Sequence, residues 1–311
     1  MSNSIRICEV SPRDGLQGEC HIPTTEFKTS LINNLVAAGL PYIEAGSFVS
    51  PKAVPAMAAT AEVIKGVQRS QDTTITSLVL NEKGLDRALE AEVDGICVVM
   101  VVTPTLCRKN NGVEPFEALE RSRRLIRRAK DQNLFVRLDI APAFVCPYDG
   151  FVPISAVEKP VLELYAEGVN EIALCDTIGG ATPKEVGNLV SRLIPEIGQD
   201  TLGVHLHDTR GLGMANAYAA LEAGCRLFDA SVGGLGGCPF AKGAKGNIAT
   251  EDLVFLAHSL GYKTDVDLKK LHNIGDDLEA EFGRKVGGGT REFWQSLNQE
   301  KKDAFNSGRF C

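Results

Sequence analysis

Two histidines separated by one residue, in the run His205-Leu-His207, carry the clearest chemical signal in the sequence. If this run ends a β-strand, both imidazoles point to the same face, because successive side chains of a strand alternate between faces. A carboxylate such as Asp14 and an amide oxygen such as Asn247 would complete a mixed nitrogen and oxygen site that leaves positions open for substrate. Such histidines can also be hydrogen-bonded core residues, but this spacing favours a site for Mn²⁺, Mg²⁺ or Zn²⁺.

Charged residues near this set have types suited to catalysis. Arg13 precedes Asp14, and at the end of a strand its guanidinium would be a fixed cation where negative charge develops on an oxygen. The alternative for Arg13 is an ordinary surface ion pair. Glu44 stands in an apolar run between Ile43 and Phe48, which predicts a buried carboxylate that pairs with an inner arginine and supports the site from behind.

The segment Ser231–Asn247 contains six glycines and Cys238. Glycines lose backbone entropy on ordering and bury no side chain, so they indicate a loop that turns sharply or opens and closes. The pattern matches neither the dinucleotide fingerprint nor a P-loop. Nearby lysines and a metal would lower the pKa of the Cys238 thiol and make it an acid or base, although a passive thiol is the alternative. The basic residues that could meet an anionic ligand, or simply be solvated, are Lys242, Lys245, Arg108 and Lys109.

Short apolar runs alternate with amphipathic segments of helical length, which is the pattern of a parallel sheet with crossover helices. Strands are expected at 5–10, 42–48, 74–80, 95–100, 135–141, 171–177, 202–207 and 227–232. Helices are expected near 24–39, 53–66, 82–92, 115–132, 155–167, 183–196, 211–224 and 249–261. Eight such units in about 250 residues predict an α/β fold of the closed (β/α)8 TIM barrel type, since a doubly wound sheet usually has fewer strands.

No proline- or serine-rich linker divides the chain, so residues 1–262 are predicted to form one catalytic barrel domain. Residues 263–311 would add a helix over Val266–Phe282 and a tail with the only tryptophan, Trp294, packed on the barrel or at a dimer contact. In a TIM barrel the active site forms at the carboxyl ends of the strands, so polar residues there are candidates for substrate contact. The further candidates of this kind are Gln17, Arg137, Asp139, Asp176 and Thr177.

The composition favours a globular protein that acts on small molecules. A formal net charge of −7 and a pI of about 5.4 argue against nucleic acid or an anionic membrane as partner, because those need a basic surface. No apolar run is long enough to span a bilayer and no secretory pattern is present, so a cytoplasmic location is expected. The nine cysteines form no C-x-x-C pair, which fits reduced thiols rather than disulfides or structural zinc.

With these residues assembled, the sequence resembles the 3-hydroxy-3-methylglutaryl-CoA lyase family of metal-dependent barrel enzymes. The resemblance covers roughly residues 5–262 and is most specific in the S-V-x-G-L-G-G-C-P run that begins at Ser231. The other matching runs are Glu9–Gln17, Ile43–Lys52, Cys146–Asp149, Asp176–Gly179, His205–Thr209 and Ala249–Leu253.

The resemblance implies a retro-aldol (Claisen-type) cleavage of a hydroxyacyl-CoA thioester that depends on a divalent cation, Mg²⁺ or Mn²⁺. His205 or Asp14 would remove the hydroxyl proton, and Arg13 would stabilise the enolate that leaves as acetyl-CoA. Cys238 would deliver or relay a proton on a loop that closes and excludes water. By analogy, the C-terminal helix and tail imply a homodimer or higher homo-oligomer. The implied metal ligands are Asp14, His205, His207 and Asn247.

Departures from the family pattern fall in the expected pocket. Cys20 replaces a lysine, Asp139 and Ala141 replace a tyrosine and a serine, and Ala173 replaces another serine. An inward Asp139 would either pair with Arg137 or select a different acyl group. The default substrate is 3-hydroxy-3-methylglutaryl-CoA, cleaved to acetyl-CoA and acetoacetate, and a related tertiary-hydroxy thioester such as citramalyl-CoA is the alternative.

Two other functions are less favoured by the sequence. A condensing enzyme of the isopropylmalate synthase type usually continues His-x-His with Asn-Asp, where this chain has Asp208-Thr209. A non-catalytic acyl-CoA or metabolite binder would not need the complete set of reactive side chains. Both would be excluded by metal-dependent turnover of a hydroxyacyl thioester.

Overall fold

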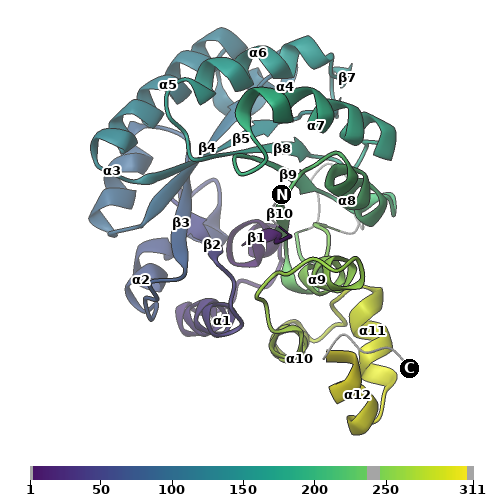
Figure 1. Cartoon of the computed structure of the whole chain (residues 1–311). Helices are drawn as coiled ribbons and strands as arrows, with labels where there is room; N and C mark the ends of the chain where they lie inside the picture. The colour runs from purple at the N-terminus through teal and green to yellow at the C-terminus, as the bar shows by residue number, and fades with distance from the viewer. Residues whose placement is uncertain (1–2, 237–245, 307–311) are drawn as a thin grey trace.

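The computed structural model describes residues 3–236 and 246–306. Eight parallel strands close into a barrel in the order β1-β10-β9-β8-β5-β4-β3-β2 (Figure 1). The predicted (β/α)8 barrel with an additional C-terminal helical segment is therefore confirmed. The barrel strands are β1 Arg6–Glu9, β2 Tyr42–Ser47, β3 Thr74–Val79, β4 Gly95–Val101, β5 Phe135–Ala141, β8 Glu171–Asp176, β9 Leu202–Leu206 and β10 Leu227–Ala230.

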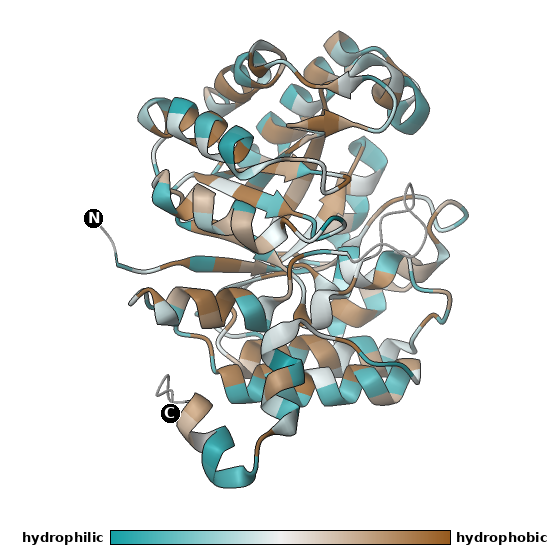
Figure 2. Cartoon of the chain, turned by 90° about the vertical axis from the view of Figure 1, so that its right-hand side faces the viewer, coloured by the Kyte–Doolittle hydropathy of each residue, from teal (hydrophilic) through white to brown (hydrophobic). Residues whose placement is uncertain are grey.

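Helices that follow the strands cover the outside of the barrel (Figure 1). In Figure 2 the strands are largely hydrophobic, whereas the outer helices mix hydrophobic and hydrophilic residues, as expected for elements with one face on the core. Leu35, Ile126 and Val190 are completely buried on three of these helices. The helices are α1 Thr25–Ala37, α2 Thr60–Lys65, α3 Glu82–Glu90, α5 Pro115–Asp131, α6 Ile154–Tyr165, α7 Pro183–Ile197, α8 Gly213–Glu222 and α9 Thr250–Ser259.

The structure differs from the sequence-based expectation at three places between strands β2 and β8. The predicted helix over 53–66 is a 3-10 turn, η2 Pro55–Met57, followed by the short helix α2, because Pro55 favours a new start rather than a helix interior. Helix α4 Pro104–Asn111, which begins with a proline and ends at left-handed Gly112, was not expected. A small antiparallel hairpin, β6 Val145–Cys146 with β7 Gly150–Phe151, was also not expected.

The C-terminal segment consists of three helices, α10 Leu268–Phe282, α11 Gly289–Ser296 and α12 Gln299–Asn306. The expected helix over 266–282 is present as α10, which packs beside α1 and α9, and the expected tail contains two further helices (Figure 1). His272 on α10 stacks on Trp294 of α11 with ring centroids 4.3 Å apart. Aromatic stacking therefore joins α11 to α10.

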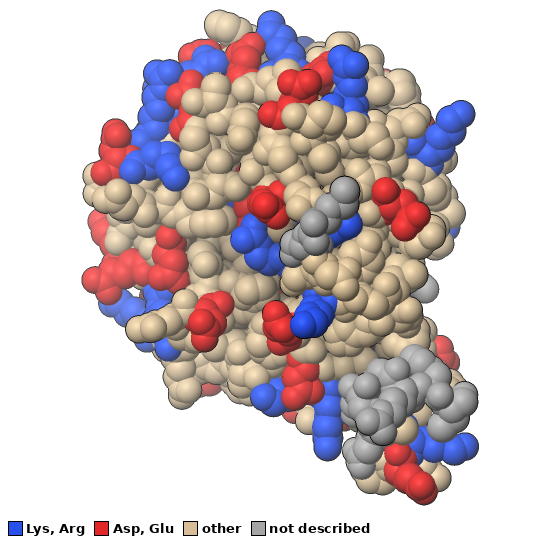
Figure 3. Space-filling model, viewed as in Figure 1, with Lys and Arg blue, Asp and Glu red and all other residues tan. Residues whose placement is uncertain are grey.

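Within residues 3–236 and 246–306, no helix combines the length and apolar character that a membrane crossing requires. On the face shown in Figure 3, acidic and basic side chains are intermixed. The cysteines of the described chain are all unpaired thiols, as the sequence predicted.

Candidate active site and metal centre

Arg13 and Asp14 lie on a single turn, η1 Ser11–Gly15, that follows β1 directly. The backbone N–H of Ser11 donates to Glu9 Oε1 at 2.9 Å, and the other Glu9 oxygen accepts from Thr250 Oγ1 at 2.6 Å. Burial raises the pKa of Glu9, although these hydrogen bonds oppose the rise. Glu9 thus fixes the turn that carries both predicted catalytic residues.

His205 and His207 extend from the carboxyl end of β9 into the barrel interior, as the alternation of a strand requires. Their Nε2 atoms lie 3.1 Å apart, and both side chains are buried. Gly203 of the same strand permits a close approach of β10, because a Cβ there would lie 2.9 Å from the Leu227 Cβ. The strand therefore brings both imidazoles to the same face, inside the barrel.

Asp14 completes the cluster. Its Oδ2 lies 4.0 Å from Nε2 of His205 and 3.7 Å from Nε2 of His207. Among the described residues these three form the group of side chains that can hold a metal ion. Burial alone would raise the pKa of Asp14, but Arg13 and the two histidines outweigh it and hold that pKa far below its ordinary value. The carboxylate is therefore ionised, as a metal ligand must be.

Asn247, the last residue of the glycine-rich segment, lies next to this cluster. Its Nδ2 donates to Asp14 Oδ2 at 2.8 Å and to the Leu235 carbonyl at 3.0 Å. Its Oδ1 is buried and has no hydrogen-bond partner within the described chain, and the same holds for Nδ1 of His207. A buried oxygen without a partner is costly, and a cation would satisfy it. The residues present therefore fit a divalent metal with nitrogen and oxygen ligands.

The two described ends of the glycine-rich segment meet beside Asp14. Gly236 has a φ of +106°, and a Cβ there would lie 2.5 Å from the Asn247 amide nitrogen. Only glycine can combine this left-handed backbone with that approach. Cys238, Lys242 and Lys245 lie outside the described residues, so their predicted roles are not located.

Arg13 is held between two carboxylates. Its Nε donates to Glu44 Oε2 and its Nη1 donates to Asp14 Oδ1, both at 2.6 Å. The pKa of Glu44 rises to about 7, chiefly because of burial, with Arg13 opposing and Asp139 adding to the rise. The expected pairing of Glu44 with an inner arginine is present, and the arginine is Arg13. The guanidinium is thus fixed next to the metal cluster, which consists of the side chains of Asp14, His205 and His207.

Arg137 lies one layer deeper in the barrel than the metal cluster. Its Nη1 donates to Glu171 Oε2 at 2.8 Å, and its Nη2 donates to Asp229. Asp139 is a more distant neighbour, with its Oδ1 3.4 Å from Nε of Arg137. The structure therefore does not bring the Arg137 guanidinium to the mouth of the barrel, where the sequence placed a substrate contact.

The other predicted contact residues lie around the mouth in different settings. Gln17 is exposed on the turn after η1. Asp176 is buried at the end of β8 and accepts from the backbone N–H of Gly180 at 2.8 Å; burial raises its pKa. Thr177 follows it and is partly buried. On α4, Arg108 pairs with Glu114 at 3.0 Å and Lys109 lies over the Tyr148 ring.

Asp229 was not singled out from the sequence, although it contacts the metal cluster. Its Oδ2 lies 2.9 Å from Nδ1 of His205. Burial would raise the pKa of Asp229, but Arg137 and then His205 outweigh it and lower that pKa. The sequence feature that could have identified Asp229 is that it is a single carboxylate in the apolar strand Leu227–Ala230. Glu9 in β1 has the same feature.

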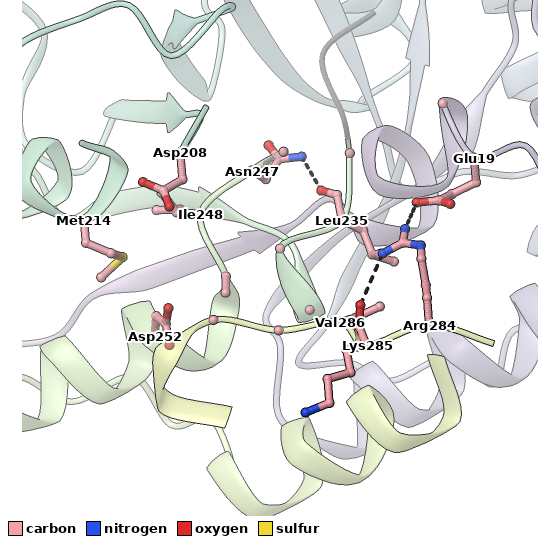
Figure 4. Close-up of a pocket in the computed structure, with 18 residues that line it drawn as sticks. Glu19, Asp208, Met214, Leu235, Asn247, Ile248, Asp252, Arg284, Lys285 and Val286 are labelled. Carbon is pink, nitrogen blue, oxygen red and sulfur yellow. Dashed lines mark hydrogen bonds and ion pairs between the residues drawn. The ribbon is translucent and has the colours of Figure 1, made fainter. Parts of the chain in front are cut away.

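A pocket of about 350 Å³ opens beside Asn247 (Figure 4). One wall is the glycine backbone at both ends of the glycine-rich segment, and the other is the chain after α10. Arg284 on that second wall pairs with Glu19, and Lys285 is exposed next to it. The pocket is thus lined by Asn247 and by the basic side chains of Arg284 and Lys285.

A family model described as HMGL-like matches residues 4–278 of this chain. The chain belongs to the HMGL-like family. This HMGL-like chain is 40% identical over 282 residues to a hydroxymethylglutaryl-CoA lyase of Bacillus subtilis, covering 91% of this chain and 94% of the relative.

Two further similar proteins have names or titles that mention other molecules. A Pseudomonas aeruginosa protein, named as a 3-hydroxy-3-isohexenylglutaryl-CoA/hydroxymethylglutaryl-CoA lyase, is 39% identical and covers 92% of this chain and 96% of its own length. The structure of a lyase from Acinetobacter baumannii, in complex with coenzyme A and 3-methylmalate, has a TM-score of 0.91 at 37% identity. It covers 96% of this chain and 97% of its own chain.

Proposed function

We propose that this chain is a carbon–carbon lyase that cleaves 3-hydroxy-3-methylglutaryl-CoA to acetyl-CoA and acetoacetate. One observation carries the proposal: Asp14, His205 and His207 converge at the mouth of an HMGL-like barrel, with Arg13 fixed beside them. Relatives that share about nine-tenths of the chain bear the corresponding lyase names. Fold alone would not support the activity, because barrels host many chemistries.

The proposed metal is Mg²⁺ or Mn²⁺, held by Asp14, His205, His207 and Asn247. The partnerless Oδ1 of Asn247 supports its inclusion with the three clustered side chains. Such a cation supplies charge that polarises substrate oxygens and lowers the cost of developing negative charge. Mixed imidazole and oxygen ligation suits several divalent metals, and we propose Mg²⁺ or Mn²⁺ among them.

The proposed reaction breaks the bond between C2 and C3 of the acyl group. His205 or Asp14 takes the proton of the tertiary hydroxyl, whose oxygen becomes the ketone oxygen of acetoacetate. The electron pair of the broken bond passes to the thioester as an enolate, and a proton added at its carbon gives acetyl-CoA. Arg13 lies where a fixed guanidinium can stabilise the enolate oxygen. We assign delivery or relay of the final proton to Cys238, and a supporting role to Glu44.

The proposed partner of this site is a CoA thioester. The pocket beside Asn247 has exposed positive charge at Lys285, which suits the phosphates of such a molecule (Figure 4). Gln17, Asp176 and Thr177 at the mouth remain proposed substrate contacts. We further propose a homodimer or higher homo-oligomer, which light scattering of the full chain tests.

The acyl group is the least constrained part of the proposal. Asp139 on β5 and Ala173 on β8, two departures from the family pattern, are paired in strand register. Both are buried, and Asp139 adds negative charge that contributes to the raised pKa of Glu44. This observation favours a second candidate within the same class, a different tertiary-hydroxy acyl-CoA such as citramalyl-CoA.

A panel of hydroxyacyl-CoA thioesters tests the proposal. The purified chain is incubated with each thioester and Mg²⁺ or Mn²⁺, and the products are identified by mass spectrometry. We expect acetyl-CoA and acetoacetate from 3-hydroxy-3-methylglutaryl-CoA. A higher kcat/KM for another tertiary-hydroxy thioester would select the second candidate. Absence of cleavage across the panel would contradict the lyase function itself.

A further inference from the structure

Buried charges beneath the metal cluster form a chain that ends on His205. Arg137, Glu171 and Asp229 come from three different strands, and each is at most 3% exposed. Arg137 donates one N–H to Glu171 at 2.8 Å and another to Oδ1 of Asp229. The second oxygen of Asp229, Oδ2, lies 2.9 Å from Nδ1 of His205. Both oxygens of this carboxylate therefore have a fixed partner.

We propose that Arg137 and Asp229 are positioning residues that hold His205 as the tautomer with its proton on Nδ1. A neutral imidazole has one N–H donor and one acceptor nitrogen, and an ionised carboxylate can only accept. The nitrogen that faces Asp229 must therefore carry the proton, and the lone pair of Nε2 is presented to the metal. A His205 held in this way has no free lone pair, so of the two proposed bases it leaves Asp14 to take the hydroxyl proton. The inference deepens the proposed function, since it rests on the metal site proposed there.

Arg137 is itself fixed on several sides. The Tyr42 ring lies under its guanidinium, with 5.5 Å from Cζ to the ring centroid. Glu171, which accepts from Arg137, also forms an ion pair with Arg6 at 2.5 Å. The planar fork of an arginine can bond two carboxylates at once, which a lysine ammonium on a flexible stem does not reproduce. The position of Asp229 thus depends on the arginine side chain, not only on its charge.

His207 provides an internal contrast. Its Nδ1 has no hydrogen-bond partner among the described residues, so no carboxylate fixes its tautomer. Its Nε2 lies 3.1 Å from Nε2 of His205. The contact with Asp229 therefore distinguishes His205 from its neighbouring histidine.

Nitrogen NMR of the full chain, labelled with ¹⁵N-histidine and freed of metal by chelation, tests the tautomers directly. The signals are assigned by replacing His205 and His207 one at a time. At a pH at which the imidazole of wild-type His205 is neutral, we expect its proton on Nδ1. In Asp229→Asn, Arg137 keeps the amide oxygen as acceptor, so the amide N–H₂ faces His205 and donates to Nδ1. The proton of His205 then moves to Nε2, and the affinity for Mn²⁺ falls by about 10–100-fold.

A second variant and a control separate positioning from folding. Arg137→Lys keeps the buried positive charge but not the double contact, so we expect both tautomers of His205 and an intermediate loss of Mn²⁺ affinity. Arg6→Met removes a half-exposed partner of Glu171 and leaves the Asp229 contact, so tautomer and affinity should match those of the wild type. Equal effects of Arg6→Met and Arg137→Lys would overturn the proposal.

The wild-type measurement tests the proposal even where the variants do not fold, because a neutral, metal-free His205 with its proton on Nε2 contradicts it directly. A folded Asp229→Asn with unchanged tautomer and Mn²⁺ affinity contradicts it as well. Wild-type protein that binds no Mn²⁺ but shows the Nδ1 tautomer would instead contradict the metal site of the proposed function. The two failures are therefore distinguishable.

Discussion

Arg13 and Glu44 are joined by a 2.6 Å hydrogen bond from Nε to Oε2, although they lie 31 positions apart in the chain. Arg13 also contacts Asp14, so its guanidinium lies between Glu44 on β2 and the cluster of candidate metal ligands. A cation held on two sides needs no reorganisation when charge develops on the substrate, which is the condition under which electrostatic stabilisation is most effective.

Arg13→Gln should therefore reduce kcat by about 100–1000-fold, the range found when a preorganised donor to an oxyanion is removed. Steady-state cleavage of the preferred thioester measures this loss. Arg69→Gln serves as a matched control, because Arg69 pairs with Asp94 on the surface and such pairs contribute little. Equal kcat values for the two variants would remove Arg13 from the catalytic residues.

Asn247 and Cys238 should have separable effects. Loss of the Asn247 amide removes an oxygen ligand, so Asn247→Ala should weaken metal binding by roughly 10–100-fold. Cys238→Ser should lower turnover far more than metal affinity, since the proposed role of the thiol is proton transfer. Calorimetric metal titration and kcat measured at saturating metal separate the two quantities. The reverse pattern would mean that the roles of the two residues are exchanged.

Asp139→Tyr restores the residue of the family pattern next to Ala173. A buried negative charge disfavours an acyl carboxylate near it, by Coulomb repulsion in a medium of low dielectric. We expect the ratio of kcat/KM for 3-hydroxy-3-methylglutaryl-CoA over the other thioesters to rise by about tenfold, which corresponds to ~1.4 kcal/mol. Asp139→Asn, which removes the charge without the ring, is the control for charge. An unchanged ratio in both variants would show that Asp139 does not select the acyl group.

The stack of His272 on Trp294 should make the C-terminal helices sensitive to acid. Burial and then the charge of the nearby Arg291 lower the pKa of His272 to about 3, against the opposing charge of Asp276. The folded state therefore binds fewer protons than the unfolded state between the ordinary pKa of 6.5 and about 3. Stability from this group is complete above pH 6.5 and is lost as pH falls towards 3.

Fluorescence of Trp294, the only tryptophan, reports this transition. Protonating the buried ring costs on the order of 5 kcal/mol, so the stack should open in acid and the emission should shift to longer wavelength. His272→Phe keeps the stacking and cannot titrate, so its emission should stay constant over the same pH range. Identical acid titrations of wild type and variant would contradict this assignment.

The barrel and the core of the metal cluster follow from local sequence patterns. His205 and His207 were predictable because alternation along a strand places them on one face, and Asp14 because it follows the first strand directly. Helix α4 was missed because its sequence, Pro104–Asn111, is mainly polar, and the apolar contacts of Leu106 and Cys107 arise only in the folded barrel. The helices of the tail likewise depend on packing against α9 and α10.

The supporting charges could not be predicted in the same way. Asp229 and Glu9 are single carboxylates in apolar strands, and nothing local in the sequence identifies their partners. Arg137 was a candidate for substrate contact because it is a polar residue of a strand whose carboxyl end forms the expected site, yet its depth in the barrel depends on strand register with Glu171. Sequence patterns determine which way a strand residue points, whereas register determines its level, and register appears only in the closed barrel.

We propose that the cluster of Asp14, His205 and His207 at the barrel mouth supports metal-dependent cleavage of a hydroxyacyl-CoA. Acetyl-CoA release from 3-hydroxy-3-methylglutaryl-CoA by chelator-treated full-length protein, before and after Mg²⁺ or Mn²⁺ is restored, tests this dependence, with His207→Ala assayed in parallel. We expect release that is lost on chelation, recovered with metal, and absent from His207→Ala at every metal concentration that restores the wild type. Equal release with and without metal, or full activity of His207→Ala, would contradict it.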